Sequence, residues 1–108
     1  MEKTIETVNF DASGELVSFV DELFDDLPKF YDRIVSADIY LKQHSGETME
    51  EKEAEAKVFL PGHEIFSNAR GKSFQEASNK VFTKVKRQLI EIKERDKDKH
   101  QPRSDKPE

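Results

Sequence analysis

Residues 34–60, IVSADIYLKQHSGETMEEKEAEAKVFL, decide the fold, because they hold the pattern of two strands and the turn between them. Apolar and polar side chains alternate at 34–42 and again at 53–60, which is typical of half-buried strands. The polar segment HSGETMEE joins them, so we predict an antiparallel hairpin. The residues expected to face inward are Val35, Ala37, Ile39 and Leu41 in the first strand and Ala54, Ala56, Val58 and Leu60 in the second.

A strand and an amphipathic helix are predicted before the hairpin. The segment TIETVNF, residues 4–10, is rich in β-branched side chains and alternates in part, which indicates a strand. Asp11 and Ser13 offer N-caps for a helix. Pro28 cannot continue the helical hydrogen-bond ladder, so this helix should end near Leu27. The apolar residues along one helical face are Leu16, Phe19, Val20, Leu23 and Leu27.

A short strand and a second helix are predicted after the hairpin. The turn PGH precedes residues 64–69, which read as a short strand. The segment SFQE, residues 73–76, has the pattern of a capping box. The Ser73 hydroxyl would accept from the Glu76 N–H, and the Glu76 side chain would reach back toward the backbone at the start of the helix. We expect the helix that follows to run to about Arg95. Its apolar face consists of Phe74, Ala77, Val81, Val85, Leu89 and Ile92.

The order of elements, β-α-β-β-β-α, predicts an α+β fold in which two helices pack on one face of a four-stranded sheet. The first β-α-β crossover should leave its two strands parallel. Because no apolar residue lies beyond Ile92, we expect a single domain at residues 1–95. Residues 96–108 are charged and contain proline, so we expect a disordered tail.

Charge is unevenly distributed along the 108 residues, although the net charge is only −5. Residues 1–64 carry 6 basic and 16 acidic side chains, a net of −10, whereas residues 65–108 carry 12 and 7, a net of +5. Such asymmetry suggests a polyanionic partner for the basic part, and a solvated basic helix face is the alternative. There is no cysteine, no signal-peptide pattern and no apolar run of membrane-spanning length. We therefore expect a cytoplasmic protein with no membrane partner.

Catalytic and metal-binding patterns are missing from the sequence. His44, His63 and His100 fall in two turns and the tail, without the spacing of metal ligands. The carboxylates are so numerous that pairs at any spacing are expected by chance, and the four glycines form no phosphate-binding loop. We expect no enzyme, no metal, no cofactor and no small-molecule substrate.

Basic residues of the second helix form a cationic rim beside its apolar face. At about 100° per residue, three of them lie within about 60° of one another on one side, and Lys86 and Lys93 lie on the other. Such a rim on a rigid element suits phosphate contacts along a nucleic acid. The alternative is that these cations only favour the negative end of the helix dipole and keep the helix soluble. The three are Lys80, Lys84 and Arg87, and Lys72 stands just before the helix.

Two aromatic residues define a second candidate surface. Tyr40 and Phe59 should point away from the core, onto the open face of the sheet, where bases could stack. Asp38, Glu53 and Glu55 lie beside them and would repel phosphates. We therefore favour cross-strand packing, or cover by another protein chain, over nucleic-acid binding at these rings.

The chain closely resembles the ribosome hibernation-promoting factor family, also called ribosome-associated inhibitors or sigma-54 modulation proteins. Two segments carry the resemblance, VNFDASGELVSFVDELFDDLPKFYDRIVSADIYLK at 8–42 and PGHEIFSNARGKSFQEASNKVFTKVKRQLIEIKE at 61–94. The resemblance implies the same β-α-β-β-β-α fold, similar to double-stranded-RNA-binding domains. It also implies binding to the small ribosomal subunit in the path of mRNA and of A- and P-site tRNA, which inactivates idle ribosomes in stationary phase or stress by steric occlusion. The chain resembles the short form of the family, without the C-terminal domain that joins ribosomes into dimers.

The resemblance also implies where rRNA phosphates would be contacted. Lys84 and Arg87 match the basic positions of the family's second helix, and Lys29 matches the one just after the first. Lys72, Lys80 and Lys86 extend this set by proximity. The carboxylates of DELFDD at 21–26 depart from the family, whose members often carry lysines there, so they would oppose rRNA or meet a basic ribosomal protein.

Off the ribosome a monomer is the default expectation. Two other functions remain open, a general double-stranded-RNA-binding module and a protein-interaction domain that uses the open sheet face.

Overall fold

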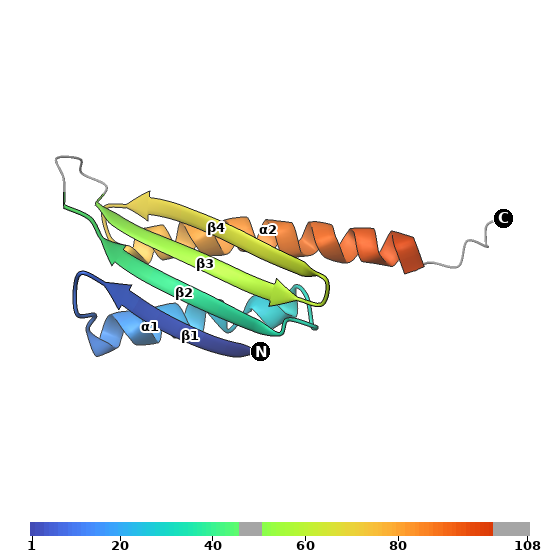
Figure 1. The fold of residues 1–108 in the computed structure, drawn as a ribbon, viewed down its shortest axis with the longest axis horizontal. Coiled ribbons are helices and arrows are strands. Elements are labelled where there is room, and N and C mark those ends of the chain that lie inside the picture. The colour runs from blue at the N-terminus through green and yellow to red at the C-terminus, as the bar shows by residue number, and fades with distance from the viewer. Residues whose placement is uncertain (46–50, 101–108) are drawn as a thin grey trace.

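The computed structural model of the protein describes residues 1–45 and 51–100. Two helices lie behind one face of a four-stranded sheet, and the other face is open to the viewer in Figure 1. The strands follow in the order β1-β2-β3-β4, with β1 and β2 parallel and the other neighbours antiparallel. The predicted α+β fold is therefore confirmed. Its elements are β1 (Glu2–Val8), α1 (Gly14–Phe24), the 3₁₀ helix η1 (Leu27–Lys29), β2 (Ser36–Gln43), β3 (Lys52–Leu60), β4 (His63–Gly71) and α2 (Phe74–His100).

The β2–β3 hairpin forms in the register that the alternation requires. Ala37 pairs with Val58 and Ile39 with Ala56, and all four side chains are fully buried. Residues 46–50 of the predicted turn lie outside the described residues. The inward position predicted for Val35 is wrong, since its side chain is 57% exposed. The strand begins only at Ser36, and at this end of the sheet the side chain of Ile34 enters the core in place of Val35.

Helix α1 begins where expected and ends earlier. The Ser13 hydroxyl caps it by accepting from the Leu16 N–H at 3.1 Å. The helix stops at Phe24, because the chain tightens into η1, which holds Pro28 near its start. This tightening leaves Leu27 still in the core and turns Phe24 into it as well.

Helix α2 is capped by Ser73 and runs past its expected end near Arg95. The Ser73 hydroxyl accepts from the Glu76 N–H at 3.0 Å, while the Glu76 carboxylate accepts from the N–H of Lys72, one residue before the cap. The helix continues to His100, so the first five residues beyond Arg95 are helical. Within this extension, Asp96 accepts from the Tyr31 hydroxyl at 3.2 Å. The remainder of the expected tail, 101–108, lies outside the described residues.

The core lies between the sheet and the two helices. All six apolar residues predicted along α2 are buried, and the helix packs mainly on β4 and β3. Lys3 of β1 is largely buried beside α1, where its ammonium group donates to the Asp21 carbonyl and pairs with the Asp21 and Asp25 carboxylates. Burial lowers the pKa of Lys3, but these partners outweigh it, so the net shift is upward. This ion-pair cluster fastens the edge strand β1 to α1.

Candidate nucleic-acid interface

Two lysines of α2 lie along the free edge of β4. The Lys80 ammonium group donates to the Arg70 carbonyl at 3.0 Å, and the Lys84 ammonium group donates to the Asn68 carbonyl at 2.9 Å. Strand β4 pairs only with β3, so these carbonyls belong to its unpaired side. The contacts hold two cations at fixed positions along the boundary between β4 and α2. The Lys84 ammonium group has three donors, so N–H groups beyond the one bound to Asn68 remain to meet a phosphate.

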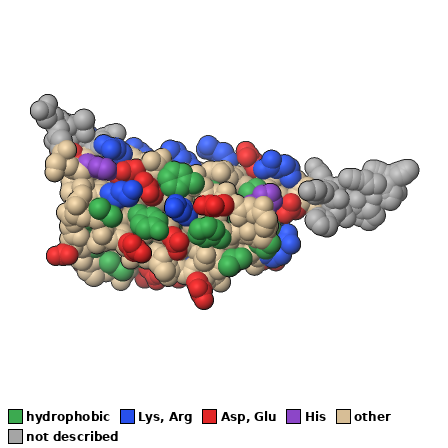
Figure 2. Space-filling view, in the orientation of Figure 1, with side chains coloured by type: hydrophobic (Ala, Val, Ile, Leu, Met, Phe, Trp, Pro, Cys, Tyr) green, Lys and Arg blue, Asp and Glu red, His purple; other side chains and the backbone are tan. Residues whose placement is uncertain are grey.

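The β4–α2 boundary is rich in cations. Figure 2 shows Lys and Arg side chains along the edge of the molecule where β4 and α2 lie. Lys72, just before the Ser73 cap of α2, and Arg70, near the end of β4, are both exposed. The helical pattern of basic residues could not include Arg70, because this residue lies in β4. Its position in a strand that ends one residue before Lys72 is the signal that could have found it.

The opposite side of α2 carries a second group of cations beside η1. The Lys86 ammonium group lies over the Phe30 ring, 4.8 Å from its centroid. A cavity of 310 Å³ is lined here by Lys29, Phe30, Ile90, Lys93 and Glu94. An adjoining cavity of 290 Å³ is lined by Thr83, Lys86, Arg87 and Ile90.

The six candidate residues thus lie on α2 and its flanks, in two groups. Arg87 links them, because it lies on the same side of the helix as Lys80 and Lys84 and also lines the cavity that contains Lys86. Among the residues whose side chains the structure describes, Arg87 has no hydrogen-bond or ion-pair partner. Lys29, in contrast, pairs with Asp26 at 3.2 Å on the surface. Phe30 and Ile90 were not predicted as part of any site, since a sequence pattern does not show which apolar residues surround a cavity.

The carboxylates of DELFDD are largely occupied within the protein. Asp21 and Asp25 pair with Lys3, and Asp26 pairs with Lys29. These contacts offset the negative charge that the sequence places at the end of α1. The acidic helix therefore repels phosphates less than its composition indicates.

Glu76 lies among the cations at the start of α2. The hydrogen bond from the Lys72 N–H, together with the nearby Lys80 ammonium group at 3.5 Å, lowers the pKa of Glu76. Glu76 therefore remains ionised at neutral pH and offsets one positive charge there. Its effect is local, because Lys84 and Arg87 lie at least two helical turns further along α2.

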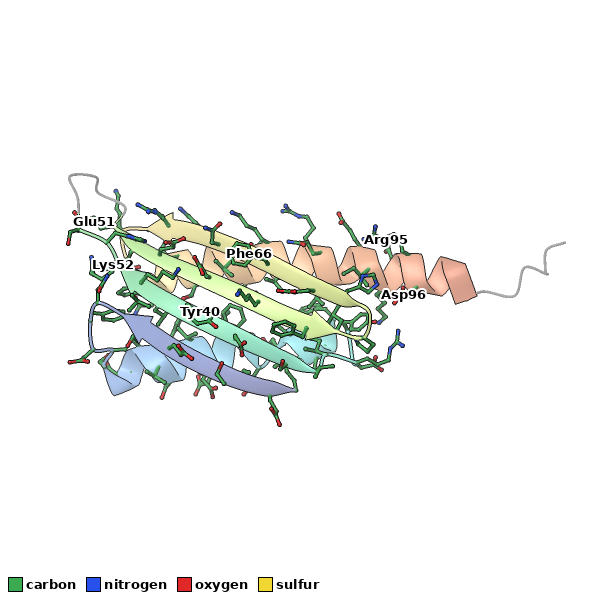
Figure 3. All side chains as sticks on the ribbon, in the orientation of Figure 1. Tyr40, Glu51, Lys52, Phe66, Arg95 and Asp96 are labelled. Carbon is green, nitrogen blue, oxygen red and sulfur yellow. The ribbon has the colours of Figure 1, made fainter. Side chains whose placement is uncertain are left out.

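The open sheet face is mixed in character. Figure 3 shows Tyr40 and Phe66 on the side of the sheet away from the helices. Phe66 is 51% exposed, whereas Tyr40 and Phe59 are half-buried. Phe66 was not predicted as part of any site; it follows the buried Ile65 in a strand, and the alternation of faces along a strand is the signal that could have found it. Figure 2 shows the hydrophobic side chains of this face as separate spots among acidic and basic groups, so this face offers no continuous cationic surface.

No helix within residues 1–45 and 51–100 is long and apolar enough to cross a membrane. The same residues contain no group of three His, Cys, Asp or Glu side chains that could hold a metal ion.

The fold and the cationic helix place the chain among small α+β domains in which two helices cover one face of a four-stranded sheet. It is similar in structure to the N-terminal domain of Thermus thermophilus Protein Y, with a TM-score of 0.72 and 16% identity over 85% of this chain and 99% of that one. It is also similar to a ribosomal subunit interface protein from Coxiella burnetii, with a TM-score of 0.75 and 20% identity over 86% of this chain and 98% of the other. No curated protein sequence matches the chain significantly. Residues 4–97 match the family of sigma 54 modulation proteins and S30EA ribosomal proteins, and the chain belongs to that family.

Proposed function

We propose that the protein binds the small ribosomal subunit and inactivates idle ribosomes by occupying the path of mRNA and of A- and P-site tRNA. The observation that carries this proposal is the cationic surface of α2 in a chain of this family. The solved structures that the chain resembles include a ribosomal subunit interface protein and the N-terminal domain of a Protein Y. The proposed partner is rRNA, with basic ribosomal proteins as further contacts, and the protein acts as a cytoplasmic monomer before it binds.

The mechanism requires binding alone. Lys80 and Lys84 are fixed to the edge of β4, so their cations are already placed before a phosphate arrives. A prearranged cationic row loses little side-chain freedom on binding, which favours affinity. Occupation of the tRNA and mRNA path then excludes those ligands, and release restores the subunit. Expression in stationary phase or stress would suit such a reversible inactivation.

An alternative function is supported by Phe66. An aromatic side chain that is 51% exposed on an open sheet face is typical of a protein-binding surface. A protein-interaction domain would bind in a salt-tolerant manner, and its complex would depend on Tyr40 and Phe66 rather than on α2. A general double-stranded-RNA-binding module is the third possibility, and it would bind duplex RNA as tightly as the subunit.

The test is co-sedimentation with purified small subunits at low and high salt. We expect saturable, salt-sensitive binding that mRNA and initiator tRNA displace. The double variant Lys84→Glu, Arg87→Glu should keep its circular dichroism spectrum and lose binding. The matched control, Lys52→Glu with Lys57→Glu, makes the same change of charge on β3 and should still bind. Unchanged binding of the α2 variant would reject α2 as the interface, and binding to duplex RNA alone would favour the general module.

A further inference from the structure

The outer surface of α2 contains an apolar residue surrounded by cations. Ile90 is 38% exposed and lines both cavities beside η1. Lys29 and Lys93 line the first cavity, and Lys86 and Arg87 line the second. We call the two adjoining cavities, which share Ile90, the Ile90 hollow. It combines an exposed apolar residue with a cationic rim. Cations alone would keep a helix soluble, so solubility does not account for the exposed Ile90.

Phe30 forms a wall of the hollow and is held in place. Its ring meets the Phe82 ring edge to face at 6.3 Å, and the Lys86 ammonium group covers it. The packing leaves Phe30 little freedom to rearrange. The hollow therefore exists before a ligand binds, and Ile90 is the apolar surface that a ligand would cover.

We propose that the Ile90 hollow binds the base of one unpaired RNA nucleotide, whose flanking phosphates meet the surrounding cations. This inference rests on the proposed function, since it names the part of the RNA that α2 would read. Charge decides between a nucleotide and an apolar protein side chain as the occupant. Four cations and one carboxylate line the hollow, and that balance complements a base flanked by phosphates. Bases without partners are recognised in this way, by apolar or aromatic contact on a face and hydrogen bonds at an edge.

Glu94 gives the hollow a preference among bases. A carboxylate weakens a surface that binds phosphates alone, yet Glu94 lines the same cavity as Lys29 and Lys93. Ionised carboxylates accept hydrogen bonds from the amino groups of bases and repel the carbonyl oxygens. The bound base is therefore one with an exocyclic amino group, such as cytosine or adenine, rather than uracil.

The test uses the full chain and fluorescein-labelled RNA hairpins, with anisotropy as the readout. One hairpin carries a single unpaired cytosine, a second carries uracil there, and a third is fully paired. We expect the cytosine hairpin to bind about fivefold or more tightly than the paired one. Ile90→Ala should abolish this preference without weakening binding to the paired hairpin. Val17→Ala is the control, because Val17 is 37% exposed on α1 and outside the hollow.

Glu94→Ala should remove the preference for cytosine over uracil, which we expect to be about fivefold. Equal binding of the three hairpins, or a preference that survives Ile90→Ala, would overturn the inference. If the wild type still bound small subunits in that case, the proposed function would stand without the base site. Loss of subunit binding in Ile90→Ala without any preference for the unpaired base would assign the hollow to a protein side chain. Binding to neither subunits nor RNA would overturn both proposals.

Discussion

Substitution of Arg87 by glutamine gives a quantitative test of the phosphate-binding surface. Arg87 has no hydrogen-bond or ion-pair partner among the described side chains, so its loss breaks no contact within the protein. The change should leave the free energy of unfolding within about 0.5 kcal/mol of wild type. Any effect on binding then reports the interface itself.

The magnitude follows from counterion release. If the six candidate cations each contact one phosphate, log K should fall with log salt with a slope of about −0.9 × 6, or roughly −5. In Arg87→Gln, the slope of log K against log salt should become shallower by about 0.9. At 0.1 M salt one such contact corresponds to about eightfold in affinity, roughly 1.2 kcal/mol.

The assay is titration of purified small subunits with labelled protein at several salt concentrations. Lys57→Gln on the open sheet face removes one positive charge without touching α2, so its slope should equal that of wild type. An unchanged slope for Arg87→Gln would refute the reasoning, because it would remove Arg87 from the phosphate contacts. Equal reductions in both variants would mean that overall charge, rather than α2, governs binding.

The remaining predictions concern stability. The Ser78 hydroxyl is buried without a hydrogen-bond partner among the described residues, so Ser78→Ala should raise the free energy of urea unfolding by about 1 kcal/mol, and the exposed Ser18→Ala by less. Burial raises the pKa of Glu53, but hydrogen bonds with His44 and Asn68 lower it more, so the net pKa is below normal. Glu53 therefore contributes stability that is present above its unfolded pKa and is lost as pH falls through its folded pKa. In Glu53→Gln, the free energy of unfolding should therefore fall less steeply as pH drops below about 4.5. An unaltered dependence of that free energy on pH would contradict this.

The alternation of the hairpin and the spacing of apolar residues in α2 were sufficient to predict the fold, because both patterns report burial directly. Predictions failed where burial depends on neighbouring elements. Val35 continues the alternation, yet Ile34 takes its place in the core at the start of β2. The end of α2 was misplaced because the apolar pattern stops at Ile92, whereas the last turns of the helix are polar and Asp96 contacts Tyr31.

The candidate site was predicted less completely than the fold. Helical periodicity located the cations of α2 on the two sides of its buried face. It could not show that Lys80 and Lys84 reach the carbonyls of β4, since that contact joins residues from separate elements. It also missed Ile90 and Phe30, whose shared cavity exists only when η1 packs beside α2.

The two lysines on the edge of β4 have a consequence for self-association. Unpaired strand edges are templates on which another chain can add a strand, and lysines on an edge discourage that addition. Lys80 and Lys84 go further, because their ammonium groups already occupy two of the carbonyls that an added strand would need. The residues proposed to meet RNA are thus also the ones expected to block strand addition at the edge of β4. Neutral substitutions that weaken RNA binding here should therefore also shorten the time that the free protein stays monomeric at high concentration.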